Sequence, residues 1–167
     1  IYLKTMETKH LEIASRFAIR GTVCDIKPLG EGLINDTLLV KTAEADAPDY
    51  VMQRLNRHVF PDVEMVMRNI HAVTTHIRQK LEAAGEEDID RKVLTFVPAK
   101  ENPEQLYAVV DGEYWRVMVF IADAVTKQAV NPESSRAAGE AFGRFQAMLA
   151  DIPVELGETI KDFHNME

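Results

Sequence analysis

The stretch Leu29-Gly30-Glu31-Gly32-Leu33-Ile34-Asn35-Asp36-Thr37 holds two glycines in a turn and leads into a strand that begins Thr37-Leu38-Leu39-Val40. Glycine tolerates positive φ values and has no Cβ, so a hairpin of this kind brings bare backbone close to a bulky ligand. Backbone N–H groups in a glycine-rich turn can also face phosphate oxygens. The same pattern joins strands in proteins whose hairpins bind nothing, and these residues alone leave both interpretations open.

The apolar spacing around this hairpin predicts an α+β fold, a mostly antiparallel sheet with one large helix packed on it. The expected strands cover 22–27, 36–42, 50–55, 92–98, 106–110 and 114–121, with a tight turn at Asp111-Gly112. The expected helices cover 8–19, a long segment from Pro61-Asp62 to Gly85, and a last segment from Asn131-Pro132 onward. The last helix carries an apolar face that we expect to be buried, in part against further chain: Ala138, Ala141, Phe142, Phe145, Met148 and Leu149.

Composition narrows the class of protein. The chain has 167 residues, enough for one domain or one and a half, and its net charge of −8 argues against a general nucleic-acid binder. No apolar run approaches the roughly 20 residues needed to cross a bilayer, and no signal peptide is visible. Cys24 is the only cysteine, which excludes an internal disulfide and fits a reducing cytoplasm. We expect Cys24 to be a small buried residue of a strand.

Three features follow one another in the order of a protein-kinase amino-terminal lobe: the glycine hairpin, a strand with polar side chains, and a long helix. In the strand, Val51 and Gln53 share one face while Met52 and Arg54 share the other. The phosphate-binding lysine of kinases would fall at about Gln53, which is uncharged. Arg54 is charged but points away unless the strand is bulged. Phosphate contact and simple solvation both remain open for these two side chains.

These segments resemble the superfamily of aminoglycoside phosphotransferases and choline kinases, and most of all the bacterial N-acetylhexosamine 1-kinases. The resemblance spans nearly the whole chain. Its most specific part is the Gly-x-Gly-x-Ile-Asn-Asp-Thr run that ends at Thr37, and the supporting segments are 50–56, Phe60-Pro61-Asp62, 115–121 and 160–165. It implies a protein-kinase-like amino-terminal lobe over 1–121, a hinge or connector over 122–131, and the start of a helical carboxy-terminal lobe over 132–167.

The resemblance also implies a role for individual residues. The nucleotide-binding set comprises Gly30, Gly32, Asn35 and Thr37 at the phosphate loop, Val51 against adenine, Gln53, Arg54 and Glu64, and Val119, Phe120 and Ile121 at the hinge. Glu64 is the acidic residue best placed to reach the polar group of the third strand. Alternatively, Glu64 only stabilises the helix, because a negative charge in the first turn interacts favourably with the helix dipole. Alternatively, the three hinge residues form the ordinary buried end of a strand and contact no nucleotide.

The implied activity is transfer of the γ-phosphoryl group of ATP to a sugar hydroxyl, namely the anomeric hydroxyl of an N-acetylhexosamine. The chain lacks the His-x-Asp-x-x-x-x-Asn segment of such kinases. We therefore expect a longer cytoplasmic protein, with the catalytic residues and the Mg²⁺ ligands beyond Glu167. This part alone should bind nucleotide poorly and catalyse nothing. His164 is a candidate for sugar binding. The expected partners are nucleotide and sugar, with no nucleic acid and no membrane.

Two alternatives to this activity stay open. The same fold can act on another acceptor, such as choline, homoserine or an aminoglycoside. Alternatively, the protein is a non-catalytic scaffold with a kinase-like lobe. The uncharged Gln53 at the position of the kinase lysine favours this second alternative. The sequence does not fix the oligomeric state.

Overall fold

The computed structural model describes residues 2–30, 34–125 and 129–163. Its elements are α1 (Tyr2–Ser15), β1 (Val23–Pro28), β2 (Asp36–Thr42), β3 (Tyr50–Arg54), α2 (Val63–Ala83), α3 (Ile89–Lys92), β4 (Phe96–Val97), β5 (Ala108–Val110), β6 (Glu113–Val119) and α4 (Pro132–Leu149). The strands form one antiparallel sheet in the order β1-β2-β3-β6-β4, with β5 also paired to β6. The predicted α+β class is confirmed.

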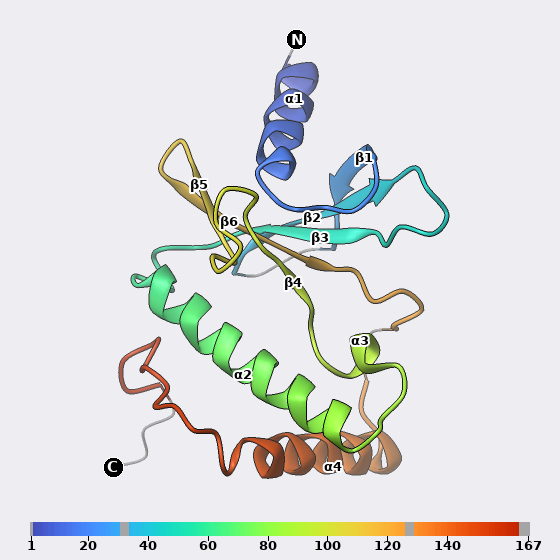
Figure 1. Ribbon diagram of the computed structural model, residues 1–167, viewed down its shortest axis with the longest axis vertical. Helices are drawn as coiled ribbons and strands as arrows, with labels where there is room; N and C mark the ends of the chain where they lie inside the picture. The colour runs from blue at the N-terminus through green and yellow to red at the C-terminus, as the bar shows by residue number, and fades with distance from the viewer. Residues whose placement is uncertain (1, 31–33, 126–128, 164–167) are drawn as a thin grey trace.

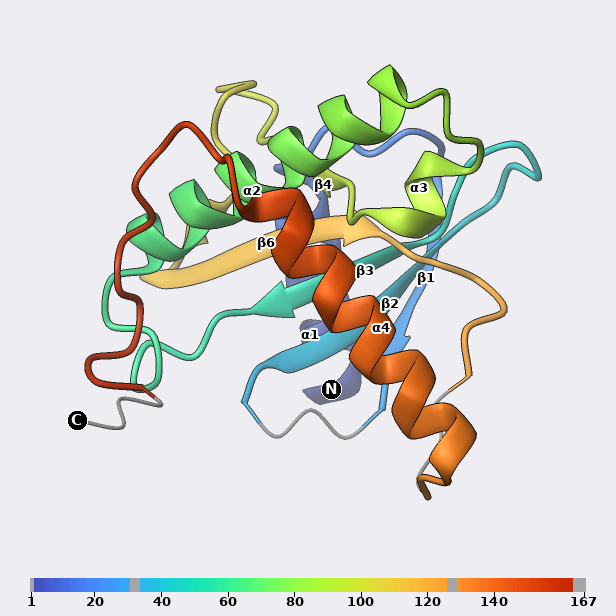
Figure 2. The ribbon, with the colours of Figure 1, turned by 90° about the horizontal axis from the view of Figure 1, so that it is seen from below.

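The helices cover the two faces of the sheet unequally. Helix α1 lies on one face, while α2 and α4 lie on the other (Figures 1 and 2). The chain therefore has three layers, with the sheet in the middle. Among the described residues, no helix has the length and apolar character needed to span a membrane.

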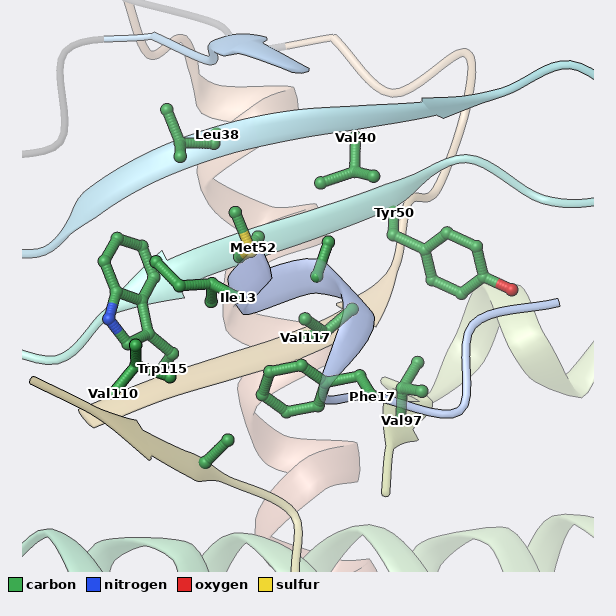
Figure 3. Close-up of a cluster of buried hydrophobic side chains, with 12 residues drawn as sticks. Ile13, Phe17, Leu38, Val40, Tyr50, Met52, Val97, Val110, Trp115 and Val117 are labelled. Atoms are coloured by element: carbon green, nitrogen blue, oxygen red, sulfur yellow. The ribbon is translucent and has the colours of Figure 1, made fainter. Parts of the chain in front are cut away.

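The face toward α1 holds the main core (Figure 3). Its inward side chains come from alternate positions of neighbouring strands, as the two-residue period of a strand requires. The cluster includes Ile13, Phe17, Leu38, Val40, Tyr50, Met52, Val97, Val110, Trp115 and Val117. The Tyr50 hydroxyl keeps its hydrogen bonds in this apolar setting, because it accepts from Arg20 N at 3.0 Å and donates to Arg20 O at 3.2 Å.

Helix α2 begins and ends where its terminal residues predict. The Asp62 carboxylate caps the helix by accepting a hydrogen bond from Met65 N at 2.8 Å. At the other end Gly85 adopts a φ of 68°, and its N–H donates to Glu82 O. The apolar stripe of the helix packs on a second cluster against the other face of the sheet, with Phe96 and Tyr114 among its neighbours.

Helix α4 starts as predicted but does not bury the predicted face. Asn131 caps it by accepting a hydrogen bond from Ser134 N at Oδ1, and Ser134 Oγ accepts one from Asn131 N. Most of this face is exposed: Phe142 is 70% exposed and Phe145 is 42% exposed, and Ala138 and Ala141 are also exposed. The described residues therefore do not cover it, and its expected burial against further chain stays a prediction. Of its apolar side chains, Met148 and Leu149 in the last turn are half-buried, where His76 and Lys80 of α2 bond to Met148 O.

Two segments depart from the strand and helix predictions. The predicted strand over 92–98 is reduced to the two residues of β4, because only Phe96 and Val97 pair with β6. Lys92 ends helix α3, and residues 93–95 are irregular. Asp88 sits in the left-handed region with a φ of 53°, and its carbonyl accepts from Arg91 N. The first helix covers Tyr2–Ser15 instead of the predicted 8–19. It begins six residues earlier, and it ends before Phe17, which makes a bridge to Ala99.

Cys24 is exposed, so the prediction that it is buried is wrong. It lies in the edge strand β1, where the pairing with β2 shifts between Val23 and Asp25. The shift makes Cys24 the extra residue of a bulge, which places its side chain outside the regular alternation of the strand.

Candidate functional site

A row of three polar side chains crosses the face of the sheet opposite α1. Thr37, Gln53 and Arg116 are direct cross-strand partners on β2, β3 and β6. Gln53 Nε2 donates to Thr37 Oγ1 at 3.0 Å, and Gln53 Oε1 accepts from Arg116 Nε at 3.0 Å and from Arg116 Nη2 at 2.8 Å. Because a guanidinium can only donate, it fixes which end of the Gln53 amide faces Arg116.

Arg116 is a half-buried cation on this row. Its Cζ lies 5.6 Å from the centre of the Phe96 ring, within the range of a cation–π contact. Burial lowers the pKa of Arg116 to about 10, so the group remains charged at neutral pH. Among the ion pairs of the described residues, none includes Arg116.

Arg54 lies on the opposite face from Gln53, as the alternation predicts. The pairing of β3 with both neighbours is regular, so no bulge turns Arg54 toward the row. Its guanidinium instead pairs with Asp36, with Nε at 2.8 Å from Oδ2, and approaches Glu113 at 3.9 Å. All three side chains are substantially exposed, so this is a solvated surface cluster.

The glycine hairpin closes directly beside the row. Leu29 N donates to Thr37 O at 2.9 Å, and Gly30 adopts a φ of 67°. A Cβ at Gly30 would meet no atom within 4 Å, so the backbone conformation and not crowding favours glycine there. Asn35 ties the hairpin to the turn after β3, since its Oδ1 accepts from Asn56 N at 2.9 Å. Gly32 lies outside the described residues.

The predicted hinge follows the end of β6. Val119 N donates to Thr95 O and Phe120 N donates to Asp49 O, both at 2.9 Å, so protein acceptors already use these two groups. Within the described ranges, the Ile121 N–H makes no such bond. Val51 is half-buried on the same face as Gln53, two residues closer to this end of the sheet.

Glu64 does not contact the polar group of β3. The partners of the Gln53 amide are Thr37 and Arg116. Glu64 lies in the first turn of α2 and is hydrogen-bonded to Tyr107. Burial, followed by the Glu64 charge, raises the pKa of Tyr107. The expected contact is absent because this turn of α2 packs beside the segment around Leu106 and Tyr107 instead of facing β3.

Three further observations concern the predicted site: the position of His164, possible metal ligands, and the hollows near the sheet. His164 lies outside the described residues, and no group of three or more metal-ligating side chains occurs in the part of the chain that the structure describes. Two hollows of about 580 Å³ each lie on the other side of the sheet and share Asp36, Arg54 and Glu113. Neither hollow is lined by Gln53 or Arg116, but the second also includes Thr37 of the row and Gly30 and Asn35 of the hairpin.

Sequence reasoning missed Arg116. It treated the segment 115–121 as a strand that leads to a hinge and gave this arginine no role. Finding it requires knowing that β6 lies beside β3 and that Arg116 pairs with Gln53. Sequence order does not show this, because α2, α3, β4 and β5 separate the two strands along the chain.

No protein-family model matches the chain. The function is therefore argued from the geometry of the row and its surroundings and from the sequence pattern.

Proposed function

We propose that this chain is the nucleotide-binding lobe of a small-molecule kinase. In this proposal the sheet with α1 and α2 forms a protein-kinase-like amino-terminal lobe over 1–121. The segment 122–131 connects it to a helical lobe that begins with α4. The whole protein works in the cytoplasm, where ATP is the donor.

The observation that carries the proposal is the order of groups along β3. The glycine hairpin and Thr37 flank the Gln53 end of the strand, and Val119 pairs with Tyr50 at the other end. Val51 lies between these ends on the same face as Gln53. The step from Gln53 to Val51 is about 7 Å at 3.3–3.4 Å per residue. A nucleotide laid along β3 would place its phosphates by the hairpin and its base near the Ile121 N–H, which makes no backbone bond among the described residues.

The acceptor in this proposal is the anomeric hydroxyl of an N-acetylhexosamine, and the sequence resemblance alone supports that choice. The γ-phosphoryl group of ATP would move to the sugar oxygen. Mg²⁺ would supply charge neutralisation, and the rest of the catalysis would be positioning.

Product analysis of the full-length protein tests the proposal. We expect incubation with Mg·ATP and N-acetylglucosamine or N-acetylgalactosamine to yield ADP and a sugar 1-phosphate, both visible by ³¹P NMR. Choline, homoserine and an aminoglycoside should give no product under the same conditions. Turnover with one of these instead would keep the kinase and replace the acceptor. No ADP with any acceptor would contradict the proposal.

A non-catalytic scaffold is the second candidate, and one observation favours it. Gln53 carries no charge at the lysine position, and Thr37 and Arg116 engage both ends of its amide. Thermal unfolding with and without Mg·ATP separates the candidates, because a bound ligand raises the unfolding temperature. A nucleotide-binding lobe is stabilised by Mg·ATP, and a scaffold is not.

A further inference from the structure

The Arg116 guanidinium has unused hydrogen-bonding capacity. Arginine carries five N–H groups, and Gln53 Oε1 accepts from Nε and from Nη2. The other N–H groups have no acceptor among the described residues. The Phe96 ring lies against the guanidinium but accepts no conventional hydrogen bond. Withdrawing a cation from water is unfavourable unless an anion or enough acceptors replace the water.

Among the described residues, no acidic side chain forms an ion pair with Arg116. Nearby acidic side chains are engaged elsewhere: Asp36 and Glu113 approach Arg54 on the opposite face, and Glu64 bonds to Tyr107. Burial is the cause that lowers the pKa of Arg116, and no neighbouring carboxylate offsets it. The side chain is only half-buried, so an anion from solution can still reach it.

Arg116 is positioned to hold an anion beside Gln53 and Thr37, on the same face of the sheet. Thr37, at the base of the hairpin, bonds to Gln53, and Gln53 bonds to Arg116. A guanidinium whose Nε edge is held by an amide oxygen has its orientation fixed before a ligand arrives. The N–H groups of Nη1 then remain for a second acceptor, and a guanidinium is well suited to phosphate oxygens.

We propose that Arg116 binds phosphate oxygens of the nucleotide and that Gln53 is a positioning residue that holds its guanidinium. The positive charge that kinases carry on the third strand is thus supplied here from the adjacent strand β6. This inference rests on the proposed function, because it takes the anion to be the polyphosphate of a nucleotide. It makes the phosphates, and not the base or the ribose, the part of the ligand that Arg116 recognises.

Comparing ADP with adenosine tests the inference, because the two ligands differ only in the phosphates. Calorimetric titration of the full-length protein should show tighter binding of Mg·ADP than of adenosine. Arg116→Gln should weaken Mg·ADP binding about 10- to 100-fold, the range of a charge-assisted hydrogen bond, and leave adenosine binding unchanged. Arg20→Gln is the matched control. It removes the same charge from an exposed side chain that bonds to Asp46 O, and both affinities should stay as in the wild type.

An observation on the wild-type protein covers the case in which Arg116→Gln does not fold. The ¹⁵N signal of Arg116 Nε, assigned with Arg116→Lys, should shift on addition of Mg·ADP and stay in place with adenosine. A purely structural arginine would not distinguish the two ligands in this way.

The outcomes separate this inference from the proposed function. The role of Arg116 would be overturned if Arg116→Gln kept the wild-type affinity for Mg·ADP, or if the Nε signal did not shift on addition of Mg·ADP. The proposal of a nucleotide-binding lobe would still stand in either case. Wild-type protein that binds neither ligand would overturn both. Equal loss of Mg·ADP and adenosine affinity in Arg116→Gln would show that the residue only supports the fold.

Discussion

The side chain of Asn69 holds the backbone of Gly157 through both of its amide atoms. Nδ2 donates to Gly157 O at 2.7 Å, and Oδ1 accepts from Gly157 N at 3.0 Å. Asn69 lies in the middle of α2, and Gly157 lies in the irregular segment after α4. The pair resembles one rung of a β-ladder made with a side chain, and it ties the last described part of the chain to the central helix.

Removing this amide should release the segment after α4. We expect Asn69→Ala to increase the hydrogen-exchange rate of the Gly157 amide and to lower the free energy of unfolding by about 1–2 kcal/mol, as for two ordinary hydrogen bonds. Asn69→Asp keeps the acceptor for Gly157 N and should retain more of the protection. NMR exchange measures both variants, and unchanged protection of Gly157 in Asn69→Ala would contradict the prediction.

Gly21 should tolerate alanine less well than Gly85. Both have positive φ values, 96° and 68°. A Cβ at Gly21 would also lie 2.7 Å from Ala47 Cβ and 2.9 Å from Glu44 Oε2, whereas a Cβ at Gly85 meets nothing within 4 Å. We expect Gly85→Ala to cost about 1 kcal/mol from backbone conformation alone. Gly21→Ala should cost at least about 2 kcal/mol because the crowding adds to it. Urea unfolding compares the two, and equal costs would show that crowding at Gly21 is relieved freely.

His10 should make stability depend on pH. Burial, followed by the charge of Lys9, lowers the pKa of His10 below 6.5, and its ring lies 6.1 Å from the Trp115 ring. The unfolded state therefore binds more protons between the folded pKa and 6.5, so stability is lost as the pH falls through that interval. We expect His10→Gln to lose less stability than the wild type between pH about 7.5 and about 5.5. Parallel loss in both proteins would assign the pH dependence to other groups.

The Gln53 and Arg116 side chains should be strongly coupled in stability. Gln53→Leu leaves the half-buried guanidinium without its amide acceptor, and we expect a loss of about 2–3 kcal/mol. Adding Arg116→Met to that variant should recover part of the loss, because both partners are then replaced by apolar groups. A double-mutant cycle of unfolding free energies measures the coupling, and additive losses would contradict it.

Local sequence signals predicted the elements that have strong boundaries of their own. The Asp62 cap and the Gly85 stop mark α2, and the Asn131 cap marks α4. The errors lie where tertiary context decides. Cys24 is exposed because a bulge shifts the register of β1 against β2.

The candidate site, too, could be predicted only where local sequence decides the geometry. Alternation along β3 predicted that Val51 and Gln53 share a face and that Arg54 points away, since this depends only on the strand itself. The partner of Gln53 could not be predicted, because it depends on which strand lies beside β3. The expected contact of Glu64 failed because the direction of α2 over the sheet is set by packing at Phe96 and Tyr114.

The bulge at Cys24 bears on how this protein avoids aggregation. A regular strand at the margin of a sheet offers a row of free N–H and C=O groups to which a strand of another molecule can add. On the margin formed by β1, the displaced register breaks that row, and Pro28 contributes no N–H. On the other margin β4 has two residues and β5 has three, too few to seed a stable foreign pairing. Both margins of the sheet thus resist extension into fibrils, although the strands between them are strongly apolar.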